Sequence, residues 1–243
     1  MELRGRVALV TGSGRRVGRA LAEALGRAGA SVAVHYNGSA SGANDAVASI
    51  RASGVDAEAF QANLADAPSI APLIDAVGAR FGGLDVLVNS AAVMERTPIG
   101  TVTAEQWDSM FALNLRAPFL LSQAAAPLLT SRRGAIVNMA DLAAFESWPA
   151  YVPHGISKAG IVQMTRALAR VFAPAVRVNA IAPGAVLLPD DWDDASGEHL
   201  EQTTPLRRLG SPDDVVGAML YLLGADYVTG ETIIVDGGRH VRA

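Results

Sequence analysis

A histidine and a lysine four residues apart are the first pair in this sequence whose types and spacing could do chemistry. His154 and Lys158 belong to the stretch PHGISK (153–158), and Asp141 lies thirteen residues before the histidine. On a helix, residues four apart share one face, so both side chains should point to a single site. Pro153 suits the first turn of such a helix. A free imidazole titrates near pH 6.5, so this side chain type can donate a proton close to neutrality.

The charges beside His154 would act in opposite directions. Lys158 would disfavour a protonated imidazole, whereas Asp141 would favour it. Two interpretations stay open: His154 is a proton donor, or it is a helix-start histidine with no role in proton transfer. Tyr151 lies seven residues before Lys158, about 10 Å along a helix axis. We therefore predict that Tyr151 forms part of the wall of the site and is not its acid.

Lys158 is also notable for its residue type. The chain contains 20 Lys and Arg residues, and Lys158 is the only lysine among them. A compact ammonium can bind a ribose and lower a neighbour's pKa, which a planar guanidinium does less well. An amine kept at this one position favours an intact cofactor site.

A glycine-rich turn is the second candidate site. The stretch TGSGRRVGRA (11–20) follows a short apolar run and carries Gly12, Gly14 and Gly18. Between a strand and a helix, such a turn lets backbone N–H groups and the helix N-terminus face a pyrophosphate. Glycines also mark ordinary tight turns, but the position after a first strand favours dinucleotide binding.

The residues after the second apolar run favour NADPH over NADH. The segment HYNGS (35–39) is followed by no acid until Asp45, whereas NAD-binding folds usually place Asp or Glu here for the ribose 2′-hydroxyl. Arg15, Arg16 and the Ser39 hydroxyl could instead bind a 2′-phosphate. The alternative is a solvated pair of arginines.

These residues are carried by alternating strand and helix patterns. Continuous apolar strands alternating with helices are typical of a parallel sheet covered on both faces. We predict one α/β Rossmann-type domain over residues 1–243, with a seven-stranded parallel sheet. The expected strands are 7–12, 31–36, about 57–64, 84–91, 134–140, 176–184 and 232–238, and the main helices are near 19–29, 41–53, 104–131, 154–172 and 212–224.

One segment breaks the alternation. Residues 185–210 are polar, acidic and irregular, contain Trp192 and follow the end of a strand. A substrate lid is expected at this place in the fold. A solvated surface loop is the alternative.

Composition excludes several other classes. The 243 residues are 50% hydrophobic, with a net charge of −4 and no cysteine. We therefore expect no disulfide, no metal site and no basic surface for nucleic acid. No apolar run is long enough for a signal peptide or a membrane span, so the expected location is cytoplasmic.

Several motifs in order resemble the classical short-chain dehydrogenases/reductases. These are the glycine turn, the segment Asn89-Ser90-Ala91-Ala92, Asn114 in LNLRAPF, the strand GAIVNMA, the spacing from His154 to Lys158, Pro183-Gly184 and the DGG at 236–238. The catalytic tyrosine of the family is His154 here. The resemblance implies catalytic positions at Asn114, Asp141, His154 and Lys158. It also implies a homotetramer, built through helices near 104–131 and 154–172 and the last strand.

Within that family the chain is most similar to the pteridine reductases. Arg16 replaces the usual middle glycine, HYNGS is similar to their phosphate-binding segment, and Asp141 replaces the catalytic serine. Val93 stands where an aromatic residue stacks on the pterin, and an apolar valine cannot stack in the same way. The resemblance implies cofactor contacts from Gly12, Gly14, Arg15, Arg16, Val17, Gly18, Tyr36, Asn37, Gly38, Ser39, Asn63, Leu64, Asn89, Ser90, Ala91, Lys158, Pro183 and Gly184, and substrate contacts from Arg16, Val93, Asp141 and His154.

The predicted function is NADPH-dependent reduction of a pterin-type C=N bond or of a carbonyl. One alternative is a catalytically weak NADP(H)-binding protein used for sensing or assembly. A general carbonyl or 3-oxoacyl reductase is the other, which Asp141 and Arg16 disfavour because such enzymes usually carry Ser and Gly there.

Overall fold

A parallel sheet of seven strands forms the centre of the computed structural model, which describes residues 1–187 and 194–241. The strand order is β3-β2-β1-β4-β5-β6-β7, which confirms the predicted α/β Rossmann-type architecture. The order reverses direction between β1 and β4, and ligands of such folds bind beyond the strand ends at this point. The strands are β1 Val7–Val10, β2 Ser31–Tyr36, β3 Ala57–Gln61, β4 Val86–Asn89, β5 Ala135–Met139, β6 Arg177–Pro183 and β7 Thr232–Val235.

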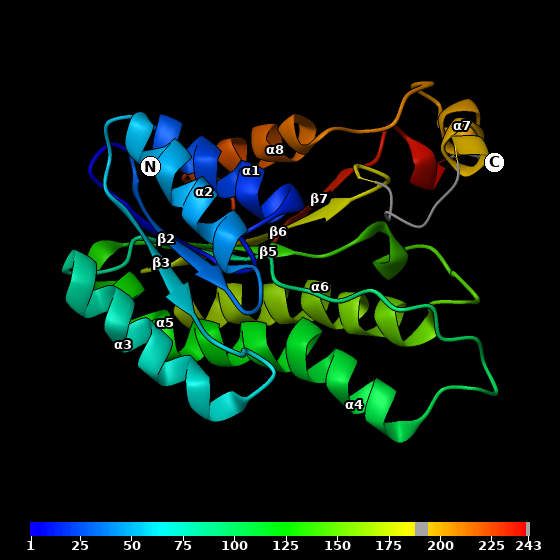
Figure 1. The fold of residues 1–243 in the computed structure, drawn as a ribbon, viewed down its shortest axis with the longest axis horizontal. Coiled ribbons are helices and arrows are strands. Elements are labelled where there is room, and N and C mark those ends of the chain that lie inside the picture. The colour runs from blue at the N-terminus through cyan, green and yellow to red at the C-terminus, as the bar shows by residue number, and fades with distance from the viewer. Residues whose placement is uncertain (188–193, 242–243) are drawn as a thin grey trace.

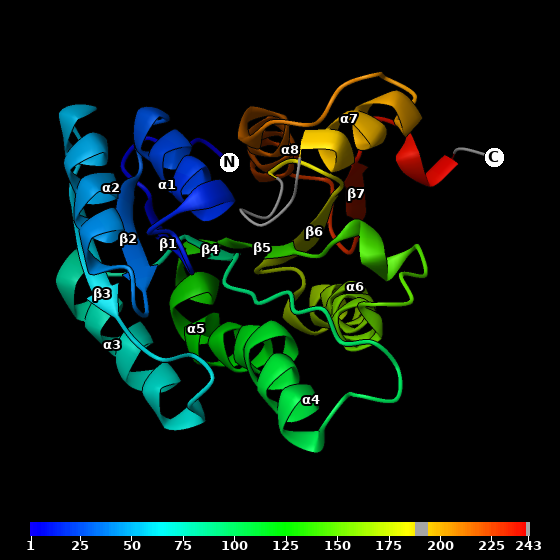
Figure 2. The same ribbon diagram turned by 45° about the vertical axis from the view of Figure 1, so that its right-hand side comes forward.

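Helices cover both faces of the sheet. α1 (Arg16–Arg27), α2 (Ala40–Ala52) and α8 (Pro212–Gly224) lie on one face, and α3 (Ile70–Phe81), α5 (Ala117–Arg132) and α6 (Val152–Phe172) lie on the other (Figures 1 and 2). The apolar side chains form one core cluster on each side. The central strands β1 and β4 are buried along their whole length, as their continuous apolar sequences predict.

The segment before α5 has an irregular turn of its own. Thr103 caps α4 (Ala104–Phe111) through a reciprocal bond with Gln106. A π-helical turn, Ala112–Arg116, then joins α4 to α5 and carries Asn114. Such π-turns are frequent at functional sites. α6 begins at Val152, two residues earlier than predicted, because Pro153 is accommodated in the first turn, where a helix needs no donor.

The segment 185–210 is more ordered than its sequence predicts. It contains α7 (Asp194–Thr203), which corrects the expectation of an irregular stretch throughout. Its two ends meet, because the Gly210 N–H donates to the Ala185 carbonyl over 2.9 Å. Trp192, which we expected in a lid, lies outside the described residues. No helix among residues 1–187 and 194–241 is long and apolar enough to span a membrane.

Candidate active site

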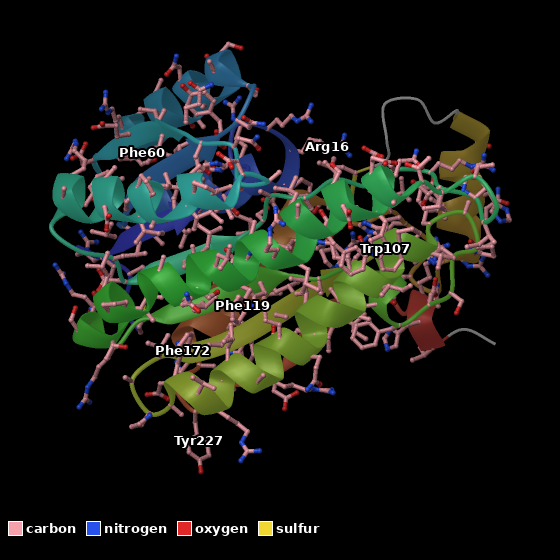
Figure 3. The ribbon with its side chains drawn as sticks, turned by 90° about the horizontal axis from the view of Figure 1, so that it is seen from below. Arg16, Phe60, Trp107, Phe119, Phe172 and Tyr227 are labelled. Carbon is pink, nitrogen blue, oxygen red and sulfur yellow. The ribbon has the colours of Figure 1, made fainter. Side chains whose placement is uncertain are left out.

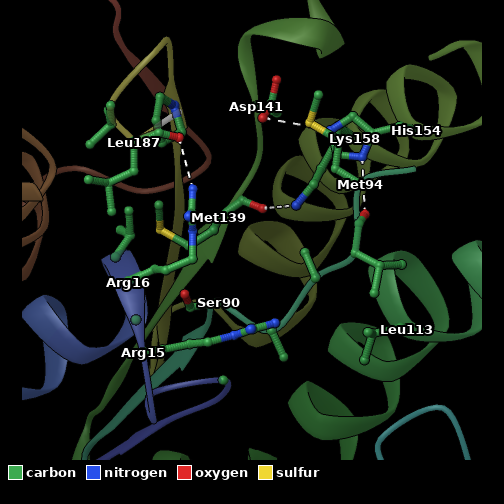
Figure 4. Close-up of a pocket in the computed structure, with 18 of the residues that line it drawn as sticks. Arg15, Arg16, Ser90, Met94, Leu113, Met139, Asp141, His154, Lys158 and Leu187 are labelled. Carbon is green, nitrogen blue, oxygen red and sulfur yellow. Dashed lines mark hydrogen bonds and ion pairs between the residues drawn. The ribbon is translucent and has the colours of Figure 1, made fainter. Parts of the chain in front are cut away.

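A long cleft runs along the carboxyl ends of the strands and brings most of the predicted site residues together (Figure 4). Its position at the point where the strand order reverses is the one expected for a dinucleotide. All the predicted cofactor and substrate residues line it except Asn89, and three of the four predicted catalytic residues do so. The predicted residues in its wall are Gly12, Gly14, Arg15, Arg16, Val17, Gly18, Tyr36, Asn37, Gly38, Ser39, Asn63, Leu64, Ser90, Ala91, Val93, Asp141, His154, Lys158, Pro183 and Gly184.

The glycine turn is packed too closely for side chains. Gly12 has a φ of +66°, and a Cβ there would lie 2.9 Å from the Ala91 Cα. A Cβ on Gly18 would lie 2.4 Å from the Gly12 carbonyl oxygen. The Thr11 hydroxyl accepts N–H bonds from Ser90 and Ala91, which fixes the turn against the end of β4. These contacts explain the spacing of the glycines and fit a turn whose backbone approaches a pyrophosphate.

Arg16 adopts a conformation that glycine would adopt more easily. Its φ is +54°, in the left-handed region that costs most residues about 1–2 kcal/mol. The side chain crosses the cleft and donates to the Leu187 carbonyl over 2.9 Å (Figure 4). Arg16 therefore joins the glycine turn to the start of the 185–210 segment, and such local strain is typical of functional positions.

The end of β2 provides a polar surface without an acid. Asn37, Gly38 and Ser39 line the cleft, Ser39 lies close to Gly14 of the glycine turn, and Ser39 precedes the first residue of α2. Two arginines near a helix N-terminus form an electropositive region that suits a 2′-phosphate. The groups present therefore fit NADPH.

His154 has two ring nitrogens in different surroundings. The side chain is buried, and Nδ1 lies 3.3 Å from the Val93 carbonyl oxygen. Because a carbonyl can only accept, Nδ1 carries the hydrogen. Nε2 makes no hydrogen bond within the described chain and lies 3.7 Å from Oδ2 of Asp141. A buried nitrogen without a partner needs one, so Nε2 is the atom placed to meet a substrate.

Lys158 lies one helical turn from His154, as the spacing predicts. Its Nζ donates to the Met139 carbonyl over 2.8 Å. Burial lowers the pKa of Lys158 to about 8, and the charge of Asp141 opposes this shift. The amine thus lies at the cleft with its charge poorly solvated, where a ribose hydroxyl would give it a further partner.

Asn114, predicted at a catalytic position, does not line the cleft itself. It is buried behind Val93, where its Oδ1 accepts from the Val93 N–H and its Nδ2 donates to the Val93 carbonyl, both over 2.9 Å. That carbonyl also accepts from His154. Asn114 and His154 are therefore linked through the backbone of Val93.

Asn89 is also placed differently from the prediction. Its side chain points into the interior and donates to Asn138 over 2.8 Å, and it does not line the cleft. A strand buried on both faces gives no sequence signal for the side to which its last residue points. Ser90 and Ala91, one and two residues later, reach the cleft instead.

Sequence reasoning missed much of the far end of the cleft. Tyr151 is in the wall, as predicted, but Trp148 and Arg239 lie there too. Glu146 connects these two, because its Oε2 accepts from the Trp148 indole over 2.8 Å and lies 3.8 Å from the Arg239 guanidinium. Other unpredicted lining residues are His35, Ser41, Ala92, Met94, Glu95, Arg96, Leu113, Met139, Ala140, Leu142, Pro149 and Ala150, and the segment 185–210, expected as a lid, contributes Ala185, Val186, Leu187 and Leu200. No group of three or more His, Asp or Glu side chains within the described ranges is arranged to hold a metal ion.

The fold and the cleft define a Rossmann-type protein with a cleft that fits a dinucleotide, and comparisons with known proteins specify the class. A family model described as enoyl-(acyl carrier protein) reductase matches residues 12–240. The 3-oxoacyl-(acyl-carrier-protein) reductase FabG of Staphylococcus aureus (strain Mu50) is 37% identical over 240 residues, which cover 96% of this chain and 98% of the relative. A 3-oxoacyl-(acyl-carrier-protein) reductase of Synechocystis is 36% identical over 241 residues, with 97% of both chains covered.

Solved structures agree with this assignment. The angucycline C-6 ketoreductase LanV with bound NADP superposes with a TM-score of 0.93 at 32% identity, covering 99% of this chain and 98% of that one. A blue fluorescent protein from a metagenomic library, in complex with NADPH, gives 0.92 at 31% identity, with 98% and 99% covered. The chain belongs to the short-chain dehydrogenase/reductase family of NAD(P)-dependent oxidoreductases.

Proposed function

We propose that this protein is an NADPH-dependent ketoreductase in which His154 supplies the proton. The observation that carries the proposal is the buried Nε2 of His154, which faces the cleft without a hydrogen-bond partner among the described residues. The 3-oxoacyl reductases and the ketoreductase among its relatives support a carbonyl substrate. This reverses the order of the sequence-based hypotheses, in which pterin reduction stood first.

The chain's own groups would divide the work as follows. NADPH, when bound, supplies a hydride to the carbonyl carbon. Protonated His154 donates from Nε2 to the carbonyl oxygen, and the neutral ring that remains keeps its Nδ1 hydrogen on the Val93 carbonyl. Lys158 would hold a ribose hydroxyl of the cofactor, and Arg15, Arg16 and Ser39 would hold its 2′-phosphate.

A second candidate, reduction of a C=N bond, is favoured by Asp141. Its Oδ2 lies 3.7 Å from Nε2 of His154, and its Oδ1 accepts from the Ala143 N–H over 2.8 Å. A carboxylate repels a carbonyl oxygen, but it stabilises a protonated imine or another N–H donor. Pterins and dihydrofolates, the substrates expected from the pteridine reductase resemblance, present such groups.

Competing substrates distinguish these candidates. Purified protein is assayed for NADPH oxidation with acetoacetyl-CoA, a small ketone and dihydrobiopterin, alongside calorimetric titration of NADPH and NADH. We expect NADPH to bind at least about tenfold more tightly than NADH, equivalent to about 1.4 kcal/mol, and the carbonyl substrates to turn over faster. Faster turnover of dihydrobiopterin would select the second candidate. Tight NADPH binding without turnover of any of them would leave a nucleotide-binding protein and reject both reductases.

A further inference from the structure

The strongest unassigned feature is a buried histidine beneath the cofactor end of the cleft. His35 is only 2% exposed, lies near the end of β2, and takes no part in the proposed chemistry. Its Nδ1 accepts from the Gly12 N–H over 3.0 Å, and its Nε2 lies 3.1 Å from the Ala62 carbonyl oxygen. One imidazole thus contacts the glycine turn after β1 and the segment after β3.

The two contacts fix the protonation state of the ring. An N–H can only donate, so Nδ1 of His35 must be unprotonated, and Nε2 must carry the hydrogen that the Ala62 carbonyl accepts. Burial lowers the pKa of His35 to about 4, in keeping with a neutral ring. The backbone carbonyl of His35 also accepts from the Ser13 N–H over 2.9 Å, so both its side chain and its backbone hold the turn.

The positions of the two contacts relate to different parts of a dinucleotide. Gly12 begins the turn that faces the pyrophosphate, and its own N–H is directed to His35. Ala62 immediately precedes Asn63 and Leu64, which line the part of the cleft expected for the adenine. No strand pairing joins β1 directly to β3, because β2 lies between them. The ring of His35 makes this connection across β2.

We propose that His35 is a positioning residue for cofactor binding, which holds the pyrophosphate turn and the adenine wall in register through its two ring nitrogens. This inference rests on the proposed use of NADPH. The bond to Gly12 and the bond to Ala62 should be separable by substitution. Asparagine can place its Oδ1 where Nδ1 lies and keep the Gly12 bond, whereas glutamine can reach the Ala62 carbonyl with its Nε2 but leaves Gly12 without its acceptor.

The test is calorimetric titration of the full-length variants His35→Asn, His35→Gln and His35→Leu with two probes, NADPH and adenosine 2′-monophosphate, which lacks the pyrophosphate. We expect His35→Gln to weaken NADPH about threefold to tenfold, the worth of one buried hydrogen bond, while adenosine 2′-monophosphate binds as in the wild type. His35→Asn should weaken both probes by a similar factor. His35→Leu should weaken NADPH by more than tenfold.

A matched control separates positioning from loss of stability. Asn179 is equally buried, donates to the Val228 carbonyl and accepts from the Glu231 N–H, and does not line the cleft. Asn179→Leu should lower the melting temperature but leave both affinities within twofold of the wild type. The inference is overturned if the three His35 variants bind NADPH within twofold of the wild type, or if His35→Gln weakens adenosine 2′-monophosphate as much as it weakens NADPH. If His35→Leu does not fold, the affinities of His35→Asn and His35→Gln for the two probes still test the inference. A wild-type protein that does not bind NADPH would overturn the proposed function instead, and this inference with it.

Discussion

At His154, the surroundings of each ring nitrogen decide which one can exchange a proton. Nδ1 is held by the Val93 carbonyl, which Asn114 fixes in turn, so only Nε2 is left to face a substrate. The sequence predicted that His154 and Lys158 share a face, because helical spacing determines this. It could not predict the contact with Val93, which lies 61 residues away in the chain.

Lys158 illustrates a residue kept at a cost in stability. Its pKa in the folded protein is about 8, below the ordinary 10.5, so the folded state binds its proton less tightly than the unfolded state. Such a shift means that the buried charge lowers the free energy of unfolding by about 3 kcal/mol. Removing the side chain would also remove the hydrogen bond to Met139, which stabilises the fold by about 1 kcal/mol. We therefore expect Lys158→Met to raise the free energy of unfolding by about 2 kcal/mol at pH 7 and to abolish turnover.

The sign of the pH dependence checks this explanation. Below pH 8 both states of the wild type are protonated and the full penalty is present. As pH rises from 8 toward 10.5, the folded state loses its proton first and the wild type gains stability relative to the variant. Urea denaturation at several pH values should show the difference shrinking over this window. A difference that is independent of pH, or a less stable variant at pH 7, would contradict the account.

The left-handed backbone of Arg16 leads to a second prediction. Because its φ is +54°, Arg16→Gly should stabilise the fold by about 1 kcal/mol, measured by urea denaturation. The same change removes a cation from the 2′-phosphate region and the bond to Leu187, so NADPH should lose at least part of its preference over NADH.

A matched control for Arg16 exists in the chain. Arg133 has a φ of +50° at the end of α5, where glycine is the preferred residue, and it does not line the cleft. Arg133→Gly should give a similar gain in stability with unchanged cofactor selectivity. If both variants keep the wild-type ratio of NADPH to NADH affinity, Arg16 does not bind the 2′-phosphate.

At the scale of the elements, the sequence predicted those strands and helices whose buried faces leave a pattern of apolar residues. Strands β1 and β4 and helix α6 were expected from continuous apolar runs and helical spacing, and each is found near its expected range. The helix α7 was missed because its sequence, DASGEHLEQT, is polar and contains Gly197, so no apolar face indicated a helix. Asn89 was misplaced because a buried strand does not reveal the direction of its last side chain.

The helix α7 is where a lid would act. Leu200 of α7 lines the cleft, and Arg16 is bonded to Leu187 at the start of the same excursion. We expect amide hydrogen exchange in residues 197–203 to slow by about tenfold when NADPH and a ketone substrate are both bound, because a closed cleft limits local opening. Amides of β5 serve as the internal reference. Unchanged exchange in α7 would favour a surface excursion with no part in closure.

At the scale of the whole molecule, one face exposes apolar side chains. Trp107 on α4, Phe119 on α5, and Ile156 and Val171 on α6 are exposed, and Figure 3 looks onto the face formed by these helices. The edge strand β7 is only half-buried along its length. Exposed apolar side chains on neighbouring helices favour association. We propose the homotetramer expected from the family resemblance, with α4, α5, α6 and β7 in its interfaces.

Sedimentation analysis tests this assembly. The wild type should sediment at about four times the chain mass of 25.1 kDa. Phe119→Glu should give smaller species, because it places a charge in an apolar contact. Ser49→Glu, on the exposed side of α2, should leave the mass unchanged. A wild-type monomer would contradict the proposal.

The most direct test of the central claim is the pH dependence of NADPH-dependent ketone reduction by the wild type and by His154→Tyr. If protonated His154 is the acid, the wild-type rate should fall as pH rises, because deprotonation of the imidazole removes the proton that the reaction consumes. A tyrosine titrates near pH 10, so the variant should keep its rate to higher pH. Lys158, with its pKa of about 8, is present in both proteins, so the two profiles differ only through the side chain at position 154 and its interaction with Lys158. Two profiles of the same shape, or a wild-type rate that increases with pH, would contradict the assignment of His154 as the proton donor.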